Sequence, residues 1–156
     1  MSTTLHVRVW RGGAAGGAWR QDEVPRRESQ TVLDVVTHIQ RALDPTLAYR
    51  YACRVGMCGS CAMTVNGAPR WTCRTHVDRV AKGGRLEISP LRNLPVIRDL
   101  VTDMREFFDK WARARGRFEG ARKRGDEFAR VAPDSEKRKL ADASIECIGC
   151  GVCYAA

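Results

Sequence analysis

The chain has 156 residues, of which 44% are apolar and 29% are charged, the balance of a globular protein with one ordinary domain or two small ones. The sequence contains no apolar run of signal-peptide length and no window near the ~18 apolar residues of a membrane-spanning helix, so we expect neither export nor a transmembrane segment. Lys and Arg outnumber Asp and Glu by 27 to 18, a formal net charge of +9. This excess favours acidic partners without choosing between nucleic acid, anionic lipid and an acidic protein face.

The first residues predict a β-hairpin. Residues 5–9, LHVRV, alternate apolar and polar side chains, as a half-buried strand does. The stretch GGAAGG at 12–17 is expected to be a flexible connection, and it fits neither of the glycine patterns that bind phosphate. Residues 19–25 would then return as the second strand.

Residues 31–45 predict a helix. Thr31 and Asp34 have the spacing of a capping box, in which two side chains satisfy the first free N–H groups of a helix. An apolar stripe follows at helical spacing: Val32, Val36, Ile39 and Leu43. Pro45 ends the helix, because the residue before a proline disfavours the α region.

A second hairpin follows the helix. Asn66-Gly67 between extended residues is a strong signal for a two-residue turn. Counting outward from this turn brings Cys61 opposite Thr72, so Cys73 returns next to Cys61. Residues 85–89 predict one more strand.

These elements favour an α+β fold with two parts. Residues 1–95 would form a ubiquitin-like β-grasp domain, and residues 96–156 would begin an α-helical domain, with a linker between Pro90 and Pro95. The helical part opens with an apolar face at helical spacing: Leu100, Met104, Phe107, Phe108 and Trp111.

The basic segment at 112–132 is interpreted as a solvated connector. It lacks the stacking aromatics and the recognisable module of a nucleic-acid-binding protein, so no nucleic-acid partner is expected. A short helix is predicted next, with Asp134 or Ser135 as its N-cap.

The seven cysteines fall into a group of four and a group of three. An odd number of thiols in a reducing compartment does not favour disulfides, and the division suggests two metal sites. The first group has the spacing C-x4-C-x2-C-x11-C: Cys53, Cys58, Cys61 and Cys73. C-x4-C-x2-C followed by a distant cysteine is typical of plant-type [2Fe–2S] clusters, whose two irons need four thiolates. Gly56 and Gly59 would let backbone N–H groups approach the sulfurs.

Four cysteines could also hold zinc. Structural zinc sites usually combine two C-x2-C pairs, which the first group fits poorly, so its spacing favours iron and sulfide. The second group has the spacing C-x2-C-x2-C: Cys147, Cys150 and Cys153. A [4Fe–4S] motif begins in this way, but it needs four ligands. We therefore interpret the chain as a fragment, and a ligand supplied from elsewhere is the alternative.

Three stretches, in this order, resemble one protein family: DPTLAYRYACRVGMCGSCAMTVNG, PVIRDLVTDMREFF and ECIGCGVC. From about residue 5 to its last residue, the chain resembles the iron–sulfur subunit of succinate dehydrogenase and fumarate reductase. The resemblance implies a [2Fe–2S] domain followed by a helical domain with [4Fe–4S] and [3Fe–4S], of which this chain would hold about two thirds. It assigns the first cysteine group to [2Fe–2S] and the second to three of the four [4Fe–4S] ligands. The [3Fe–4S] ligands would lie beyond the last residue.

The resemblance also implies the role of the chain, which is electron relay without substrate chemistry of its own. Single electrons would pass between the FAD of a flavoprotein subunit and membrane quinone. The implied partners are that flavoprotein and the membrane-anchor subunits. The implied location is the cytoplasmic face of a bacterial inner membrane.

Two features depart from the family pattern: the bulky Trp71 near Cys73, and the glycine-rich stretch at 12–17. Three alternatives remain open. One is a free-standing [2Fe–2S] carrier, and another is a zinc-stapled interaction module. The third is the iron–sulfur subunit of a molybdenum hydroxylase, which CIGCGVC disfavours because it contains no C-x-C.

Overall fold

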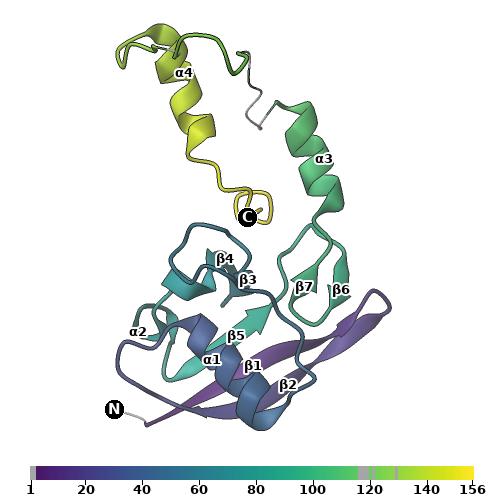
Figure 1. The fold of residues 1–156 in the computed structure, drawn as a ribbon. Helices are drawn as coiled ribbons and strands as arrows, with labels where there is room; N and C mark the ends of the chain where they lie inside the picture. The colour runs from purple at the N-terminus through teal and green to yellow at the C-terminus, as the bar shows by residue number, and fades with distance from the viewer. Residues whose placement is uncertain (1–2, 116–119, 121, 129) are drawn as a thin grey trace.

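A computed structural model of the chain describes residues 3–115, 120, 122–128 and 130–156 (Figure 1). The elements in chain order are β1 (Thr4–Gly13), β2 (Gly16–Pro25), α1 (Val32–His38), the π-helical turn η1 (Ile39–Leu43), β3 (Ala62–Val65), β4 (Ala68–Trp71), the 3-10 turn η2 (Thr72–Arg74), α2 (Val77–Val80), β5 (Arg85–Ser89), β6 (Val96–Arg98), β7 (Val101–Thr102), α3 (Arg105–Arg113) and α4 (Glu136–Ile145). Within the described ranges the strands form one seven-stranded sheet of order β4-β3-β5-β1-β6-β7, with β2 also paired to β1.

Strand β1 is the centre of the sheet. It pairs antiparallel with β2 along its whole length, parallel with β5, and through its last residue with β6. Its buried side chains alternate: Leu5, Val7 and Val9. This alternation confirms the strand predicted from LHVRV.

The glycine-rich stretch at 12–17 is mostly strand, so the prediction of a flexible connection is wrong. Both strands continue into it, and only residues 14–15 form the turn. A Cβ atom built on Gly17 would lie 2.3 Å from the carbonyl oxygen of Arg11. Glycine is needed there because the two backbones approach more closely than a side chain allows.

Helix α1 begins where the sequence predicts. Thr31 accepts the N–H of Asp34 through Oγ1 at 3.2 Å and donates its own N–H to Asp34 Oδ2 at 3.0 Å, which confirms the capping box. The helix continues as η1 and ends before Pro45, also as predicted. Leu43, however, is 42% exposed, so its place in the buried stripe is wrong. The wider π-helical turn rotates it away from the core.

The main core lies between α1 and one face of the sheet (Figure 1). Its buried members are Leu5, Val7, Val9, Val24, Val32, Val35, Val36, Ile39, Leu47, Met63, Val65, Val77, Leu86, Ile88 and Leu100. This arrangement of a mixed sheet with a helix across one face agrees with the predicted α+β, β-grasp fold.

The β3–β4 hairpin has the predicted register. Its pairs run from Val65↔Ala68 at the Asn66-Gly67 turn to Ala62↔Trp71. The next residue out, Thr72, donates both its N–H, at 3.3 Å, and its hydroxyl, at 2.7 Å, to the Cys61 carbonyl oxygen. Cys61 therefore lies opposite Thr72, as expected.

Residues 96–102 belong to the sheet, so the helical pattern predicted from residue 100 begins too early. Strands β6 and β7 lie here, and α3 starts only at Arg105. Leu100 lies in the tight connection between β6 and β7 and is buried in the main core. The division of the chain at residue 95 remains a prediction.

The C-terminal helices lie away from the sheet, and the chain then returns to it (Figure 1). Helix α4 follows Ser135, whose hydroxyl accepts the Arg138 N–H at 3.3 Å, as the sequence predicts for this cap. Part of the connector predicted at 112–132 lies outside the described residues.

A buried carboxylate holds the β6–β7 connection against the rest of the domain. Asp99 is only 3% exposed, and its Oδ1 accepts the N–H groups of Arg11 Nε and Gly12, each at 3.0 Å. Its Oδ2 accepts the Ala48 N–H at 2.9 Å. Burial alone would raise the pKa of Asp99, but the N–H donors of Ala48, Arg11 and Gly12 bring it below the ordinary value. One ionised side chain therefore joins β1, the segment before the cysteine loop, and the β6–β7 connection.

We expect the Asp99→Asn substitution to lower the free energy of unfolding at pH 7 by about 3 kcal/mol, because it removes a buried charge from Arg11 and turns one amide NH2 toward an N–H donor. The pKa of Asp99 is lower in the folded state than in the unfolded state. Its stabilisation is therefore present above about pH 4 and is lost as the pH falls through the folded pKa. Urea unfolding at pH 7 and pH 3 measures both effects.

Asp142→Asn is the matched control, since Asp142 pairs with Arg138 on α4 and the two side chains are 55% and 45% exposed. It should change the free energy of unfolding by less than about 0.5 kcal/mol. Equal effects of the two substitutions would contradict the structural role of Asp99.

Candidate metal centre

The loop from residue 53 to residue 61 wraps around the sulfur of its first cysteine. Three residues in it have left-handed backbone angles: Arg54 (φ 59°), Gly56 (φ 79°) and Gly59 (φ 68°). These bends turn successive N–H groups inward. The N–H groups of residues 55, 57 and 58 donate to Cys53 Sγ at 3.5, 3.3 and 3.3 Å. The loop thus provides a ring of donors for a negatively charged sulfur.

Cys58 lies on the exposed side of this loop. Its Sγ accepts the hydroxyl of Ser60 at 3.2 Å and the N–H of Cys53 at 3.5 Å. The hydrogen bond from Ser60, followed by that from the Cys53 N–H, lowers the pKa of the Cys58 thiol to about 6. These hydrogen bonds favour the thiolate of Cys58, which is the form that binds metal.

Cys61 and Cys73 form the buried side of the site. They are 3% and 7% exposed and pack together against Leu33 of α1. Burial, followed by the neighbouring Cys61 thiol, raises the pKa of Cys73 to about 11. The hairpin thus brings Cys73 to Cys61 as the sequence predicts, and the binding of a metal would have to displace its proton.

Side chains from α1 and its flanking segments hold the loop in place. Arg54 Nη2 donates to Asp34 Oδ1 at 2.8 Å, and its guanidinium lies 5.7 Å from the ring centroid of Tyr51. Tyr51 in turn stacks on Tyr49, with ring centroids 5.5 Å apart. Sequence reasoning assigned Asp34 only to helix capping and missed its second contact, because no local pattern links it to Arg54.

The fit of an iron–sulfur cluster rests on the hydrogen-bond donors around the sulfurs of Cys53 and Cys58. Among the described residues, no three His, Cys, Asp or Glu side chains converge as ligands of a single metal ion. The N–H and O–H groups directed at two cysteine sulfurs are the second-shell donors that stabilise iron-bound thiolates. The first cysteine group therefore suits [2Fe–2S] chemically, and its ligand assignment remains a prediction.

The second cysteine group returns to this loop. Cys150 is half-buried, whereas Cys147 and Cys153 are exposed. A cavity of about 190 Å³ lies between the two groups, and its lining includes Cys58 from the first group and Cys150 from the second. The structure therefore places the two sequence-predicted sites side by side.

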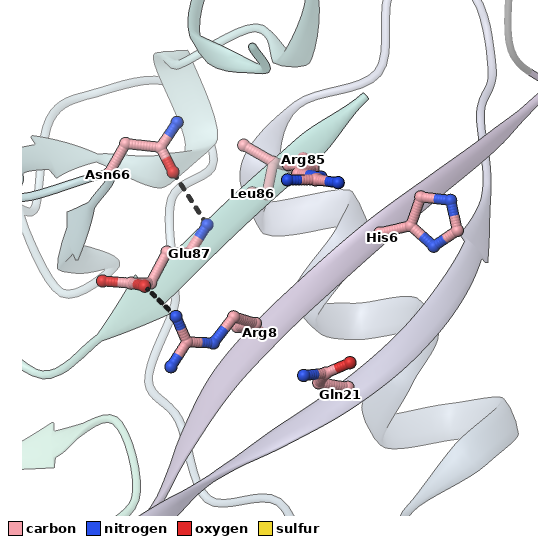
Figure 2. Close-up of a pocket in the computed structure, with 7 residues that line it drawn as sticks. All are labelled: His6, Arg8, Gln21, Asn66, Arg85, Leu86 and Glu87. Atoms are coloured by element: carbon pink, nitrogen blue, oxygen red, sulfur yellow. Dashed lines mark hydrogen bonds and ion pairs between the residues drawn. The ribbon is translucent and has the colours of Figure 1, made fainter. Parts of the chain in front are cut away.

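A larger hollow of about 490 Å³ lies away from both cysteine groups, on the outer surface of β1, β2 and β5 (Figure 2). Arg8 Nη1 donates to Glu87 Oε2 there at 3.0 Å, and Asn66 Oδ1 accepts the Glu87 N–H at 2.7 Å. No cysteine lines it, so it is not part of the candidate metal centre.

The helices in the described part of the chain are too short or too polar to cross a membrane.

Comparison with known proteins agrees with the cysteine loop. Residues 6–109, more than half of the chain, match the family described as a 2Fe-2S iron-sulfur cluster binding domain. The fumarate reductase iron-sulfur subunit of Escherichia coli O6:H1 is 34% identical over 134 residues, which cover 86% of this chain and 54% of that protein. The succinate dehydrogenase iron-sulfur subunit of Paracoccus denitrificans is 35% identical over 125 residues, covering 80% and 47%.

A solved structure extends the similarity over both cysteine groups. A chain of the Mycobacterium smegmatis Sdh1 complex in the apo form matches 99% of this chain with a TM-score of 0.82 and 30% identity, and 64% of that chain is covered. The present chain spans about half the length of the two iron-sulfur subunits named above. It belongs to the family of 2Fe-2S iron-sulfur cluster binding domains, and its relatives there are the iron-sulfur subunits of fumarate reductase and succinate dehydrogenase.

Proposed function

We propose that this chain is the electron-transfer part of a succinate dehydrogenase or fumarate reductase, relaying single electrons between the FAD of a flavoprotein subunit and membrane quinone. The observation that carries the proposal is the loop at 53–61, whose backbone N–H groups converge on Cys53 Sγ. The names of the relatives support the choice of enzyme.

In this proposal the chain's own residues hold and tune the metal centres. Four cysteines would bind [2Fe–2S]: Cys53, Cys58, Cys61 and Cys73. The second group would give three ligands of [4Fe–4S]: Cys147, Cys150 and Cys153. When bound, such clusters supply one-electron chemistry, while the chemistry of succinate and fumarate would belong to the flavoprotein. The donors on Cys53 and Cys58 favour the more negative, reduced state.

The exposed rim of the cysteine loop suits a protein partner. Val55 is 60% exposed and Met57 is 69% exposed, next to the sulfur-binding N–H groups. Large apolar side chains at such exposure gain by burial against another surface. We propose that the flavoprotein covers this rim, and that membrane-anchor subunits hold the complex at the cytoplasmic face of the membrane.

We expect anaerobically purified or reconstituted chain to contain about two irons and two acid-labile sulfides in the first site, with a rhombic EPR signal after reduction. Cys73→Ser should abolish that signal, because it removes a buried ligand. Cys153→Ser is the matched control and should leave the signal unchanged, since Cys153 lies in the other group. Bound zinc without sulfide, or an unchanged signal in Cys73→Ser, would overturn the assignment.

We also expect an FAD-containing polypeptide to co-elute with the chain isolated anaerobically from its native host, and succinate to reduce the iron–sulfur centre in that complex. Met57→Glu should reduce co-elution without loss of iron, because it places a charge in the buried interface. Leu140→Glu, at a residue that is 76% exposed on α4, is the control and should not. A chain that elutes alone with its iron would favour the free-standing carrier.

Ser60→Ala should lower the reduction potential of the [2Fe–2S] centre by on the order of tens of millivolts, because it removes one hydrogen bond to the Cys58 sulfur. Ser60→Thr keeps a hydroxyl and should stay near the wild-type potential. An EPR-monitored redox titration measures both variants. Equal potentials in all three proteins would show that this hydrogen bond does not tune the centre.

A further inference from the structure

The second cysteine group rests directly on the first loop, and the point of contact is a residue without a side chain. Gly59 is buried between the exposed Cys58 and Ser60. A Cβ atom built on Gly59 would lie 2.4 Å from Cys150 Cβ and 2.7 Å from Cys150 Cα. These distances are far below ordinary carbon–carbon contact, and one of the atoms is backbone. A side chain at residue 59 would therefore push the Cys150 segment away.

The C-terminal segment is held against the sheet domain by contacts of its own. Ala155 is fully buried, in a cluster with Phe107 of α3 and Leu91 after β5. The Tyr154 carbonyl oxygen accepts the Asn93 side-chain N–H at 3.1 Å, and its hydroxyl accepts Lys110 Nζ at 2.9 Å. The segment is thus anchored on its C-terminal side, a few residues from Cys150.

The glycines on either side of Cys150 shape the segment for this contact. Gly149 and Gly151 have left-handed angles of 65° and 72°. Cβ atoms built on them would lie 3.2 Å from Phe108 Cε1 and 3.0 Å from Met104 Cε. The segment therefore fits tightly between helix α3 and the first cysteine loop, with Cys150 directed at Gly59.

We propose that Gly59 is a positioning residue that seats the second cysteine motif on the first and so sets the separation of the two metal sites. The inference rests on the proposed function in one respect, which is that both cysteine motifs would carry clusters. The contact between Gly59 and Cys150 lies within this chain and does not depend on that function. In an electron relay, the absence of a side chain at residue 59 would keep the two sites as close as the backbones allow.

The left-handed angle of Gly59 would by itself favour glycine, so the test needs a control with the same strain. Gly56 provides it. Its φ is 79°, and the nearest atoms to a Cβ atom there belong to the side chains of Arg74, at 3.0 Å from Cγ, and Trp71, at 3.8 Å from Cε3. Gly56→Ala and Gly59→Ala thus impose similar backbone strain on one loop, but only Gly59→Ala collides with Cys150.

The experiment is alkylation of the metal-free chain with iodoacetamide under native conditions, so that no cluster blocks the thiols, with the three thiols of the second group quantified separately by mass spectrometry. In the wild type, Cys150 should react more slowly than Cys147 and Cys153, since only Cys150 is partly covered. In Gly59→Ala the ratio of the Cys150 rate to the Cys147 rate should rise to about one, because the seat is lost. In Gly56→Ala the ratio should stay at the wild-type value.

The EPR signal of the first site reports whether the loop keeps its shape in each variant. The alkylation rates are compared on the three metal-free chains, and the EPR signal is recorded on reconstituted samples of the same proteins. Protection of Cys150 that persists in Gly59→Ala, or that is lost equally in both variants, would overturn the proposal. Failure of the proposed function would appear instead as missing iron and sulfide in the wild type, which the alkylation ratio does not measure.

Discussion

The organisation of the molecule depends on the convergence of three backbone N–H groups on the sulfur of Cys53. In a regular strand or helix these N–H groups would donate to carbonyl oxygens and could not converge on one sulfur. The loop therefore leaves regular structure and bends three times into the left-handed region. Each bend at a residue other than glycine costs conformational energy, and the surrounding structure has to hold it. The Cys53 sulfur accepts the hydrogen bonds of these N–H groups, and the surrounding fold holds the loop backbone in its bent conformation.

Rigid elements provide that constraint from three directions. The β3–β4 hairpin fixes Cys61 and Cys73 through its register, and the capped start of α1 holds Arg54. The buried Asp99 joins β1 to the segment that leads into the loop. The cysteines of the first group therefore come from a loop and a hairpin, while the helix and the central strand keep these two segments in place. A site built in this way can be exposed at its rim and still be well defined.

Local patterns in the sequence were enough to predict the features on which the site depends. The Asn66-Gly67 turn and the Thr31–Asp34 box each lie within a short stretch, and each appears in the structure as expected. The cysteine spacing is equally local, and the ligand assignment drawn from it stays a prediction. The predictions are wrong where contacts between residues far apart in the sequence determine the local structure. The spacing of Leu100 predicts a helix, but Asp99 bonds to Arg11, 88 residues away, and holds that segment in the sheet. The approach of Cys150 to Gly59 likewise joins residues that no local pattern relates.

The double use of Asp34 has a consequence for how the domain opens. The same carboxylate accepts the Thr31 N–H at the start of α1 and the Arg54 guanidinium from the cysteine loop. Fraying of the first helical turn would release Asp34 from its cap and free Arg54 at the same time. The helix start and the loop should therefore behave as one cooperative unit in hydrogen exchange, with slow amides in α1 and in the loop opening together rather than in sequence.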